Sequence, residues 1–217
     1  MAPSSPQRDA TVEQVQAVRS GNVAVLAEVF DLYRDRLWQI VNFRMDIRLR
    51  GRVDADDVLQ EAYLDAEKRI QHFNEETPET LFIWLRLITS QTLVDIHRRH
   101  LGTKIRDASR ERSISGGWTS QSTTFSLSSH LLGHLTSPSQ AALREELSKQ
   151  LTIALDSMGE LDREVLALRH FEELSNGETA KVLELSEQAA SLRYVRALGR
   201  LKQILHRIPG FSDQFPG

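Results

Sequence analysis

Asp57 and Glu61, two carboxylates one helical turn apart, are the residues of this chain whose spacing best suits chemistry. Such a pair acts as general acid and base only where an apolar cleft shifts the pKa of one partner, and the sequence around them gives no evidence of a cleft. The chain has no cysteine, no H-E-x-x-H zinc pattern, no phosphate-binding glycine loop and no G-x-S-x-G nucleophile elbow. The sequence therefore indicates a binding protein that is not an enzyme and needs no metal or cofactor.

A second group of chemically suited residues lies near the C-terminus, where Gln188–Pro209 contains five basic residues and no acidic one. On a helical wheel of about 100° per residue, the face opposite the apolar stripe and its flanks carry the residues that we expect to contact DNA. These are Gln188, Ser191, Leu192, Arg193, Val195, Arg196, Arg200 and Lys202. Cations neutralise phosphates, amides and hydroxyls bond to base edges, and exposed Leu and Val side chains suit thymine methyl groups. The alternative interpretation is an ordinary solvated basic face.

Helices must position these residues, and the apolar spacing predicts an all-α chain. In the N-terminal part it predicts helices over Val12–Arg19, Val23–Phe43, Ala55–Gln71 and Glu79–His100. In the C-terminal part it predicts helices over Ser139–Met158, Asp162–Glu172, Asn176–Leu183 and Glu187–Arg207. The last two, joined by a three-residue turn, match a helix-turn-helix, whose second helix enters the DNA major groove.

A change of composition divides the chain into two small helical domains. The stretch from Ser113 to Ser139 is rich in Ser, Thr and Gly and contains no Asp, Glu, Lys or Arg. Such a composition predicts a flexible linker, which we place at residues 113–138, between domains at residues 11–112 and 139–208. Its apolar residues are unusual for a spacer. They indicate either docking on a partner, which we prefer, or a short helix near Ser128–Leu135.

The predicted helix Ala55–Gln71 has one polar, largely acidic side that carries an exposed leucine. Val58, Leu59, Ala62, Tyr63 and Ala66 form its apolar side, whereas the polar side carries Asp57, Gln60, Glu61 and Leu64. This pattern favours a protein-docking surface over a catalytic pair, although most such strips are simply solvated.

Composition sets the limits of these predictions. The chain has 217 residues, with 27 Lys+Arg against 30 Asp+Glu and a formal net charge of −3, which argues against uniform coating of a polyanion. The N-terminal MAPSSPQRDA lacks the apolar run of a secretory signal, and no stretch is long and apolar enough to cross a bilayer. We therefore expect a cytoplasmic protein with no membrane insertion.

Two blocks of the sequence resemble one family. The core-binding domain of bacterial RNA polymerase sigma factors is similar to FDLYRDRLWQIVNFRMDIRLRGRVDADDVLQEAYLDAEKRI and FIWLRLITSQTLVDIHRRHLGTKIRDASRER. Their promoter-binding C-terminal domain is similar to ALDSMGELDREVLALRHFEELSNGETAKVLELSEQAASLRYVRALGRLKQIL. A short tether between the two resembles the extracytoplasmic-function subfamily, and the N-terminal runs are most similar to variants abundant in Planctomycetes. The resemblance implies a transcription initiation factor that binds core RNA polymerase, through its beta-prime and beta subunits, and promoter DNA.

The resemblance also implies roles for individual residues. The family's D-x-x-Q-E pattern falls on Asp57, Gln60 and Glu61, which implies docking on the beta-prime coiled coil, with Leu64 beside them. The family's W-L-x-x-I block falls on Trp84, Leu85 and Ile88; in the family this helix and the loop before it, here His72–Thr80, melt and read the minus-ten promoter element. Apolar neighbours at helical spacing favour packing rather than base stacking for Trp84.

Basic residues after this block suit contact with a single strand, and we expect DNA contacts from Arg98, Arg99, Lys104 and Arg106, with His97 and His100 as planar partners for splayed bases. The family's recognition helix, which reads the minus-thirty-five element, falls on Gln188–Leu198, and its R-x-x-R-A pattern falls on Arg193, Arg196 and Ala197.

The chain departs from the family at two positions, Gln91 for the usual Asn and Ser191 for a basic residue, which leaves the promoter sequence open. The uncharged linker weakens any electrostatic mimicry of RNA in the polymerase cleft. Family members are usually held inactive by an anti-sigma factor, which is a further expected partner. The alternative to a sigma factor is a polymerase-independent helix-turn-helix regulator, with the N-terminal part as an effector or dimerisation domain.

Overall fold

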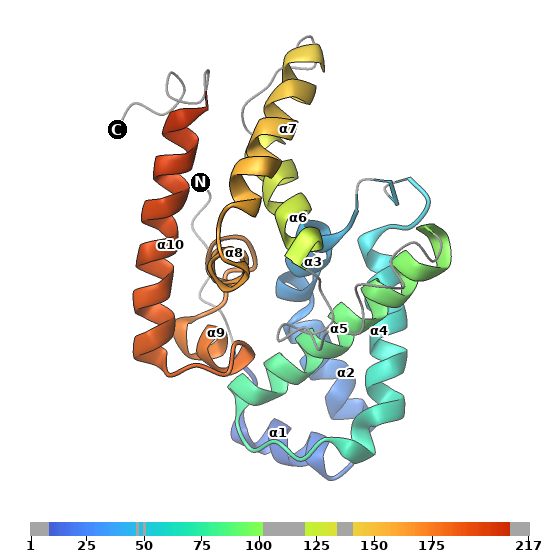
Figure 1. Ribbon diagram of the computed structural model, residues 1–217. Coiled ribbons are helices and arrows are strands. Elements are labelled where there is room, and N and C mark those ends of the chain that lie inside the picture. The colour runs from blue at the N-terminus through green and yellow to red at the C-terminus, as the bar shows by residue number, and fades with distance from the viewer. Residues whose placement is uncertain (1–8, 47, 50, 102–119, 134–140, 209–217) are drawn as a thin grey trace. The chain divides into compact units, whose positions relative to one another are not determined.

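The computed structural model describes residues 9–46, 48–49, 51–101, 120–133 and 141–208 (Figure 1). Every regular element among these residues is a helix, as the apolar spacing predicts. The chain divides into two compact units, Met1–Ile105 (unit 1) and Arg106–Gly217 (unit 2), and each is described by itself.

Unit 1 is built from five α-helices and one short 3-10 turn among the described residues. They are α1 (Val12–Arg19), α2 (Val23–Leu32), α3 (Arg34–Arg44), α4 (Ala55–Arg69), the turn Ile70–His72, and α5 (Pro78–Leu101). Helices α4 and α5 lie side by side (Figure 1). Their polar contacts join Arg69 to Gln91 and Glu61 to Arg99, so the two helices run antiparallel.

Capping residues explain where these helices begin. Thr11 and Asp54 each form a capping box with the residue three positions on, and the Asn22 side chain accepts the first free amides of α2. Such caps supply partners for amide groups that have none within the helix. They place the starts of α1, α2 and α4 where the sequence predicted them.

The single helix predicted over Val23–Phe43 is wrong, because the chain breaks at Tyr33 into α2 and α3. Tyr33 leaves the helical region (φ −93°, ψ 1°), and its ring is fully buried 5.1 Å from that of Phe82. Its hydroxyl accepts a hydrogen bond from the Ala10 amide at 2.9 Å. We attribute the break to this anchoring of a buried phenol, which periodicity alone does not reveal.

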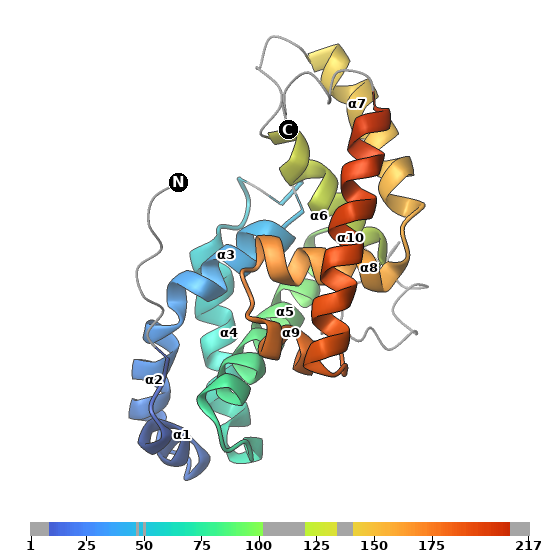
Figure 2. The same cartoon turned by 90° about the vertical axis from the view of Figure 1, so that its left-hand side faces the viewer.

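Unit 2 contains α6 (Ser120–Gly133), α7 (Ala141–Asp156), α8 (Glu160–Leu166), a π-helical turn (Ala167–Phe171), α9 (Asn176–Val182) and α10 (Glu187–Arg207). Helix α10 packs on α8, α9 and α7, and Figure 2 shows it crossing α8. The predicted helix Asp162–Glu172 is therefore α8 followed by a π turn. The bounds of α10 are those predicted.

The prediction of a flexible linker over residues 113–138 is wrong for Ser120–Gly133, which form helix α6. The neighbouring residues of that stretch lie outside the described ranges. Helix α6 packs on α7 and α8, where the Thr123 hydroxyl donates to Glu164 (2.7 Å) and the Thr124 hydroxyl donates to Asp156 (2.8 Å). Tertiary hydrogen bonds thus stabilise a helix in a segment whose composition disfavours one.

The turn between α9 and α10 gives the helix-turn-helix its sharp bend. Glu184 adopts a left-handed backbone (φ 54°), and the Leu185 amide bonds back to the Ala180 carbonyl at 2.8 Å. The Ser186 side chain then caps α10 by accepting from the Ala189 amide. The geometry is that of a helix C-terminus closed by a left-handed residue, here a glutamate rather than the usual glycine.

Candidate functional site

The polar side of α4 forms an exposed strip, which we call the docking strip: Asp57, Gln60, Glu61 and Leu64. Three of its residues are exposed, including Leu64 at 48%, and Glu61 is half-buried. The opposite side is in the core, as the wheel predicted, since Val58, Leu59, Ala62 and Ala66 are buried. Asp57 also has a structural role, because its carboxylate accepts from the Asp54 amide at 3.2 Å.

A shallow apolar groove of about 330 Å³ lies beside the docking strip, between α2 and α4. Phe30, Leu59 and Tyr63 line it, and the rings of Phe30 and Tyr63 meet edge to face at 5.4 Å. Its polar rim includes Gln60 of the strip and an ion pair of 2.5 Å between Arg34 and Asp56. The sequence does not reveal this groove, because the groove exists only once α2 and α4 are packed together.

The docking strip is tied to the basic end of α5. Arg99 donates to both carboxylate oxygens of Glu61, at 2.6 and 2.7 Å. This hydrogen bond raises the pKa of Arg99 above its ordinary value. One residue predicted to bind polymerase and one predicted to bind DNA are thus partners of each other across α4 and α5.

The basic end of α5 otherwise presents Arg98, which is exposed and pairs with Asp95 at 3.2 Å, and the exposed His100. His97 is buried, so its predicted role as a planar partner for bases is wrong. The pKa of His97 is lowered to about 4, mainly by burial; Asp46 opposes this shift and Arg48 contributes to it. The predicted DNA contacts Lys104 and Arg106 lie outside the described residues.

Trp84 is half-buried and packs on Phe73, as expected for a packing role. Its ring lies 4.9 Å from that of Phe73, between the start of α5 and the end of the 3-10 turn. Gln91, which stands where many family members have Asn, is half-buried, and its side-chain oxygen accepts a hydrogen bond from Arg69 at 2.5 Å.

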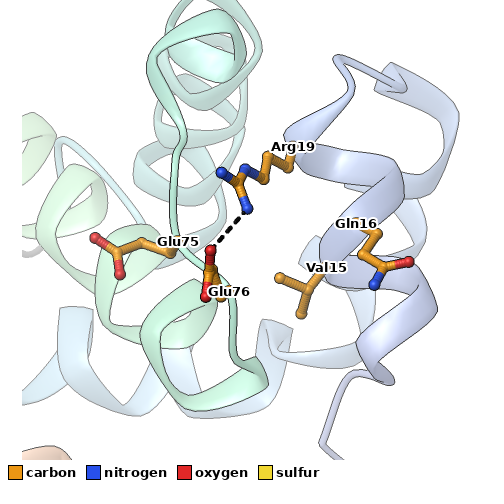
Figure 3. Close-up of a pocket in the computed structure, with 5 residues that line it drawn as sticks. All are labelled: Val15, Gln16, Arg19, Glu75 and Glu76. Carbon is orange, nitrogen blue, oxygen red and sulfur yellow. Dashed lines mark hydrogen bonds and ion pairs between the residues drawn. The ribbon is translucent and has the colours of Figure 1, made fainter.

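The loop before α5 forms a small pocket with α1 (Figure 3). The pocket has a volume of about 300 Å³ and is lined by Val15, Gln16, Arg19, Glu75 and Glu76. Arg19 bonds to Glu76 at 3.0 Å, so α1 holds the loop at one point. Both side chains are well exposed, and an ion pair of this kind contributes little to stability.

The outward side of α10 is the recognition face: Gln188, Ser191, Leu192, Val195, Arg196 and Lys202, all of them exposed. Leu192 is 50% and Val195 62% exposed, as the wheel predicted, whereas Ala190 and Ala197 are fully buried on the other side. Among the residues that the structure describes, neither Arg196 nor Lys202 forms an ion pair.

Arg193 and Arg200, also predicted to contact DNA, lie on the flank of α10 beside α8. Both donate to Asp162, Arg193 at 3.0 Å to Oδ1 and Arg200 to Oδ2. The Asp162 side chain is only 4% exposed. No local pattern of the sequence points to Asp162, which lies 31 residues before the nearer arginine.

Within the described ranges, no cluster of three or more His, Asp or Glu side chains could hold a metal ion. Nor does that part of the chain contain a helix long and apolar enough to cross a membrane. What the two units present are surfaces: a mixed acidic and apolar one on α4 and a cationic one on α10.

Comparison with known proteins identifies the family of the chain. A family model described as ECF sigma factor matches residues 9–205. The chain belongs to this family. As an ECF sigma factor it is a transcription initiation factor without an enzymatic activity of its own, in a family that binds core RNA polymerase and promoter DNA.

Individual relatives span most of the chain. The ECF RNA polymerase sigma factor SigW of Bacillus subtilis is 24% identical over 194 residues, which are 89% of this chain and 95% of SigW. The RNA polymerase sigma-H factor of Pseudomonas aeruginosa is 28% identical over 144 residues, 66% of this chain and 69% of that one. The structure of CnrH in complex with the cytosolic domain of CnrY matches with a TM-score of 0.51 and 22% identity, over 92% of this chain and 99% of CnrH. At that identity the match shows a shared fold.

Proposed function

We propose that this sigma factor docks on core RNA polymerase through the docking strip and the groove beside it. The observation that carries the proposal is the α4 surface, where exposed Gln60 lines an apolar groove and exposed Asp57 and Leu64 lie on the same polar side of the helix. A partner helix from the beta-prime subunit would cover Leu64 and the groove while its basic side chains meet the carboxylates. Such a mixture of apolar anchor and charged rim is typical of protein–protein interfaces.

Unit 1 would then open the duplex at the minus-ten element. The basic end of α5, with Arg98 and Arg99, faces a single strand in this proposal, and Lys104 and Arg106 extend the same cationic run. The pocket of about 300 Å³ between α1 and the loop before α5 lies at the other end of that helix and is lined by Glu75 and Glu76 as well as Arg19 (Figure 3). Cationic surfaces such as the basic end of α5 suit splayed single strands.

Unit 2 would read the minus-thirty-five element as duplex. The recognition face of α10 has no acidic residue and leaves Arg196 and Lys202 without an ion pair among the described residues, so both are available to phosphates or guanine edges. Leu192 and Val195 would lie against thymine methyl groups, where their exposure no longer costs free energy.

A protein inhibitor is the third partner that we propose. CnrH has been solved in complex with the cytosolic domain of CnrY, and the present chain shares that fold. An anti-sigma factor that covered the docking strip would keep this sigma factor from core polymerase. Competition between the two for the strip is the expected basis of its regulation.

The docking strip is tested with Gln60→Ala combined with Leu64→Ala. Glu61 is left unchanged, because its bond to Arg99 would confound loss of docking with loss of packing. The double variant is expected to bind purified core RNA polymerase at least tenfold more weakly and to lose promoter-dependent transcription in proportion. The matched control is Ile153→Ala, which removes an exposed apolar side chain from α7 (72% exposed) and should leave core binding unchanged.

The alternative is a regulator that works without polymerase. It predicts that the wild-type protein binds a palindromic site as a dimer and ignores core enzyme. Failure of the wild-type protein to form a complex with core polymerase at low salt would overturn the proposal. If the double variant binds core polymerase as tightly as the wild type, the docking strip is not the surface that binds polymerase.

A further inference from the structure

A buried carboxylate holds two cations of the recognition helix. Asp162 is the third residue of α8, and its two oxygens take one guanidinium each, from Arg193 and Arg200. The two arginines are seven residues apart, which is about 10.5 Å along the axis of α10 and nearly the same side of it. Asp162 therefore binds side chains two turns apart on α10, on the side of that helix beside α8.

Burial makes this arrangement more than a surface contact. The Asp162 side chain is 4% exposed, whereas Arg193 and Arg200 are 39% and 58% exposed. A carboxylate withdrawn from water needs charged or hydrogen-bonding partners, and here the two arginines supply them. Moving either guanidinium to a DNA phosphate would leave the carboxylate partly unpaired, a cost that DNA binding would have to offset.

The flank and the recognition face of α10 thus treat their cations differently. Arg193 and Arg200 are committed to a carboxylate of their own chain, while Arg196 and Lys202, among the described residues, are not paired. Asp162, Arg193 and Arg200 together carry a charge of only +1. The flank therefore attracts phosphates much less than two free arginines would.

We propose that Asp162 is a positioning residue that holds Arg193 and Arg200 back from DNA phosphates, and so limits sequence-independent binding by the recognition helix. The inference rests on the proposed DNA-binding function of α10. Each phosphate contact steepens the dependence of log K on log salt by about 0.9. Withholding two phosphate contacts makes this slope shallower by about 1.8. It also weakens binding to unrelated DNA, which raises the ratio of specific to unspecific affinity.

The experiment measures binding of the full-length protein to two labelled duplexes, one with the promoter sequence and one scrambled, across a series of salt concentrations. Asp162→Asn keeps the shape and removes the charge. It is expected to steepen the salt slope by about 1 to 2 and to strengthen binding to the scrambled duplex more than to the promoter. The matched control is Glu145→Gln, which makes the same change of net charge at an exposed ion pair with Lys149 on α7 and should change neither quantity.

Two further variants keep the result interpretable if Asp162→Asn is poorly folded. Arg200→Gln should leave the salt slope unchanged, because Arg200 is not engaged with phosphate, whereas Arg196→Gln should lower it by about 0.9. A salt slope of Asp162→Asn equal to that of the wild type would overturn the inference and leave Asp162 a packing residue. Weaker DNA binding and a shallower salt slope for Asp162→Asn would also overturn the inference, because the carboxylate would then hold the arginines in place for contact with DNA.

Failure of the proposed function gives a different pattern. Core polymerase binding uses α4 in unit 1, so it is measured in parallel and should be the same for Asp162→Asn as for the wild type. Loss of core binding by the wild type itself counts against the sigma-factor mechanism. A normal wild type with no response to Asp162→Asn counts against Asp162 alone.

Discussion

The two units both contain a carboxylate paired with arginine, and burial separates the two cases. In unit 1, Glu61 and Arg99 form two short hydrogen bonds, yet their side chains are 41% and 55% exposed. In unit 2, Asp162 is 4% exposed and holds two arginines. The Glu61–Arg99 pair is open to water, which screens its charges. The carboxylate of Asp162 is withdrawn from water and depends on its two arginines. The difference in burial therefore predicts different contributions of the two sites to stability.

The comparison extends to the surfaces that the two units offer. The docking strip and the basic end of α5 mix acids and bases within a few residues, as a protein partner with its own charges would require. The recognition face of α10 has cations and apolar side chains and no acid, which suits a polyanion with methyl groups. The docking strip thus suits contact with a protein partner, and the recognition face suits contact with duplex DNA.

The largest effect is expected from removing both partners of the buried carboxylate. Arg193→Gln with Arg200→Gln leaves Asp162 charged and buried without a cation. Because the two arginines are partly exposed and water can reach the site, we expect unit 2 to lose about 2–3 kcal/mol of unfolding free energy. Urea unfolding with hydrogen exchange of α8 and α10 amides measures the loss.

Adding Asp162→Asn to that double variant provides the control. The extra change removes the stranded charge, so most of the lost stability should return. A double variant that is as stable as the wild type would break the comparison, since Asp162 would then tolerate isolation as easily as a surface acid does.

The next effect is the response of unit 1 to acid, which depends on a buried neutral group rather than a buried charge. His97 has a pKa near 4 when folded and about 6.5 when unfolded, so the unfolded chain binds the proton first as the pH falls. The contribution of neutral His97 to the free energy of unfolding is fully present above about pH 6.5 and is lost as the pH falls from about 6.5 to about 4. We expect a loss of about 2 kcal/mol from pH 7 to 4.5.

The measurement compares urea unfolding of the wild type and His97→Gln at pH 7 and pH 4.5. The variant should lose about 2 kcal/mol less than the wild type over this interval, because no proton is taken up at position 97. His100→Gln is the matched control, since His100 is exposed at the end of the same helix. Equal acid sensitivity of His97→Gln and the wild type would show that other groups dominate.

A smaller effect tests how the recognition face reads a duplex. Uracil lacks only the methyl group of thymine, so replacing thymines one at a time in the minus-thirty-five element tests Leu192 and Val195 without altering any hydrogen bond. At one or two positions we expect about fourfold weaker binding, the equivalent of one buried methyl group at about 0.8 kcal/mol. Leu192→Ala should abolish this discrimination at its own position. Equal binding of thymine and uracil throughout would remove the apolar contact.

Local signals in the sequence account for what could be predicted. The wheel identified the buried and exposed sides of α4 and α10, because each helix has one clear apolar stripe. Caps such as Thr11 and Asp54 fixed the starts of helices. These features depend on residues within a few positions of one another, so a single sequence contains them.

The remaining features depend on contacts between distant segments. Tyr33 breaks a predicted helix because its hydroxyl bonds to Ala10, and α6 forms because Thr123 and Thr124 bond to carboxylates on other helices. Asp162 meets Arg193 and Arg200 across 31 and 38 residues. Nothing in the spacing of these residues indicates the pairing, and the resemblance to a family does not supply it either.

The smallest effect returns to the exposed pair. Arg99→Gln removes one partner of Glu61, but both side chains are open to water, so the unfolding free energy of unit 1 should fall by only about 0.2–1 kcal/mol. A double-mutant cycle with Glu61→Gln isolates the interaction, and its coupling should shrink further at high salt. Should the coupling match the loss measured at Asp162, exposure would not be what separates the two units. Should it be small while promoter opening falls sharply in Arg99→Gln, the role of Arg99 is contact with DNA rather than support of α4.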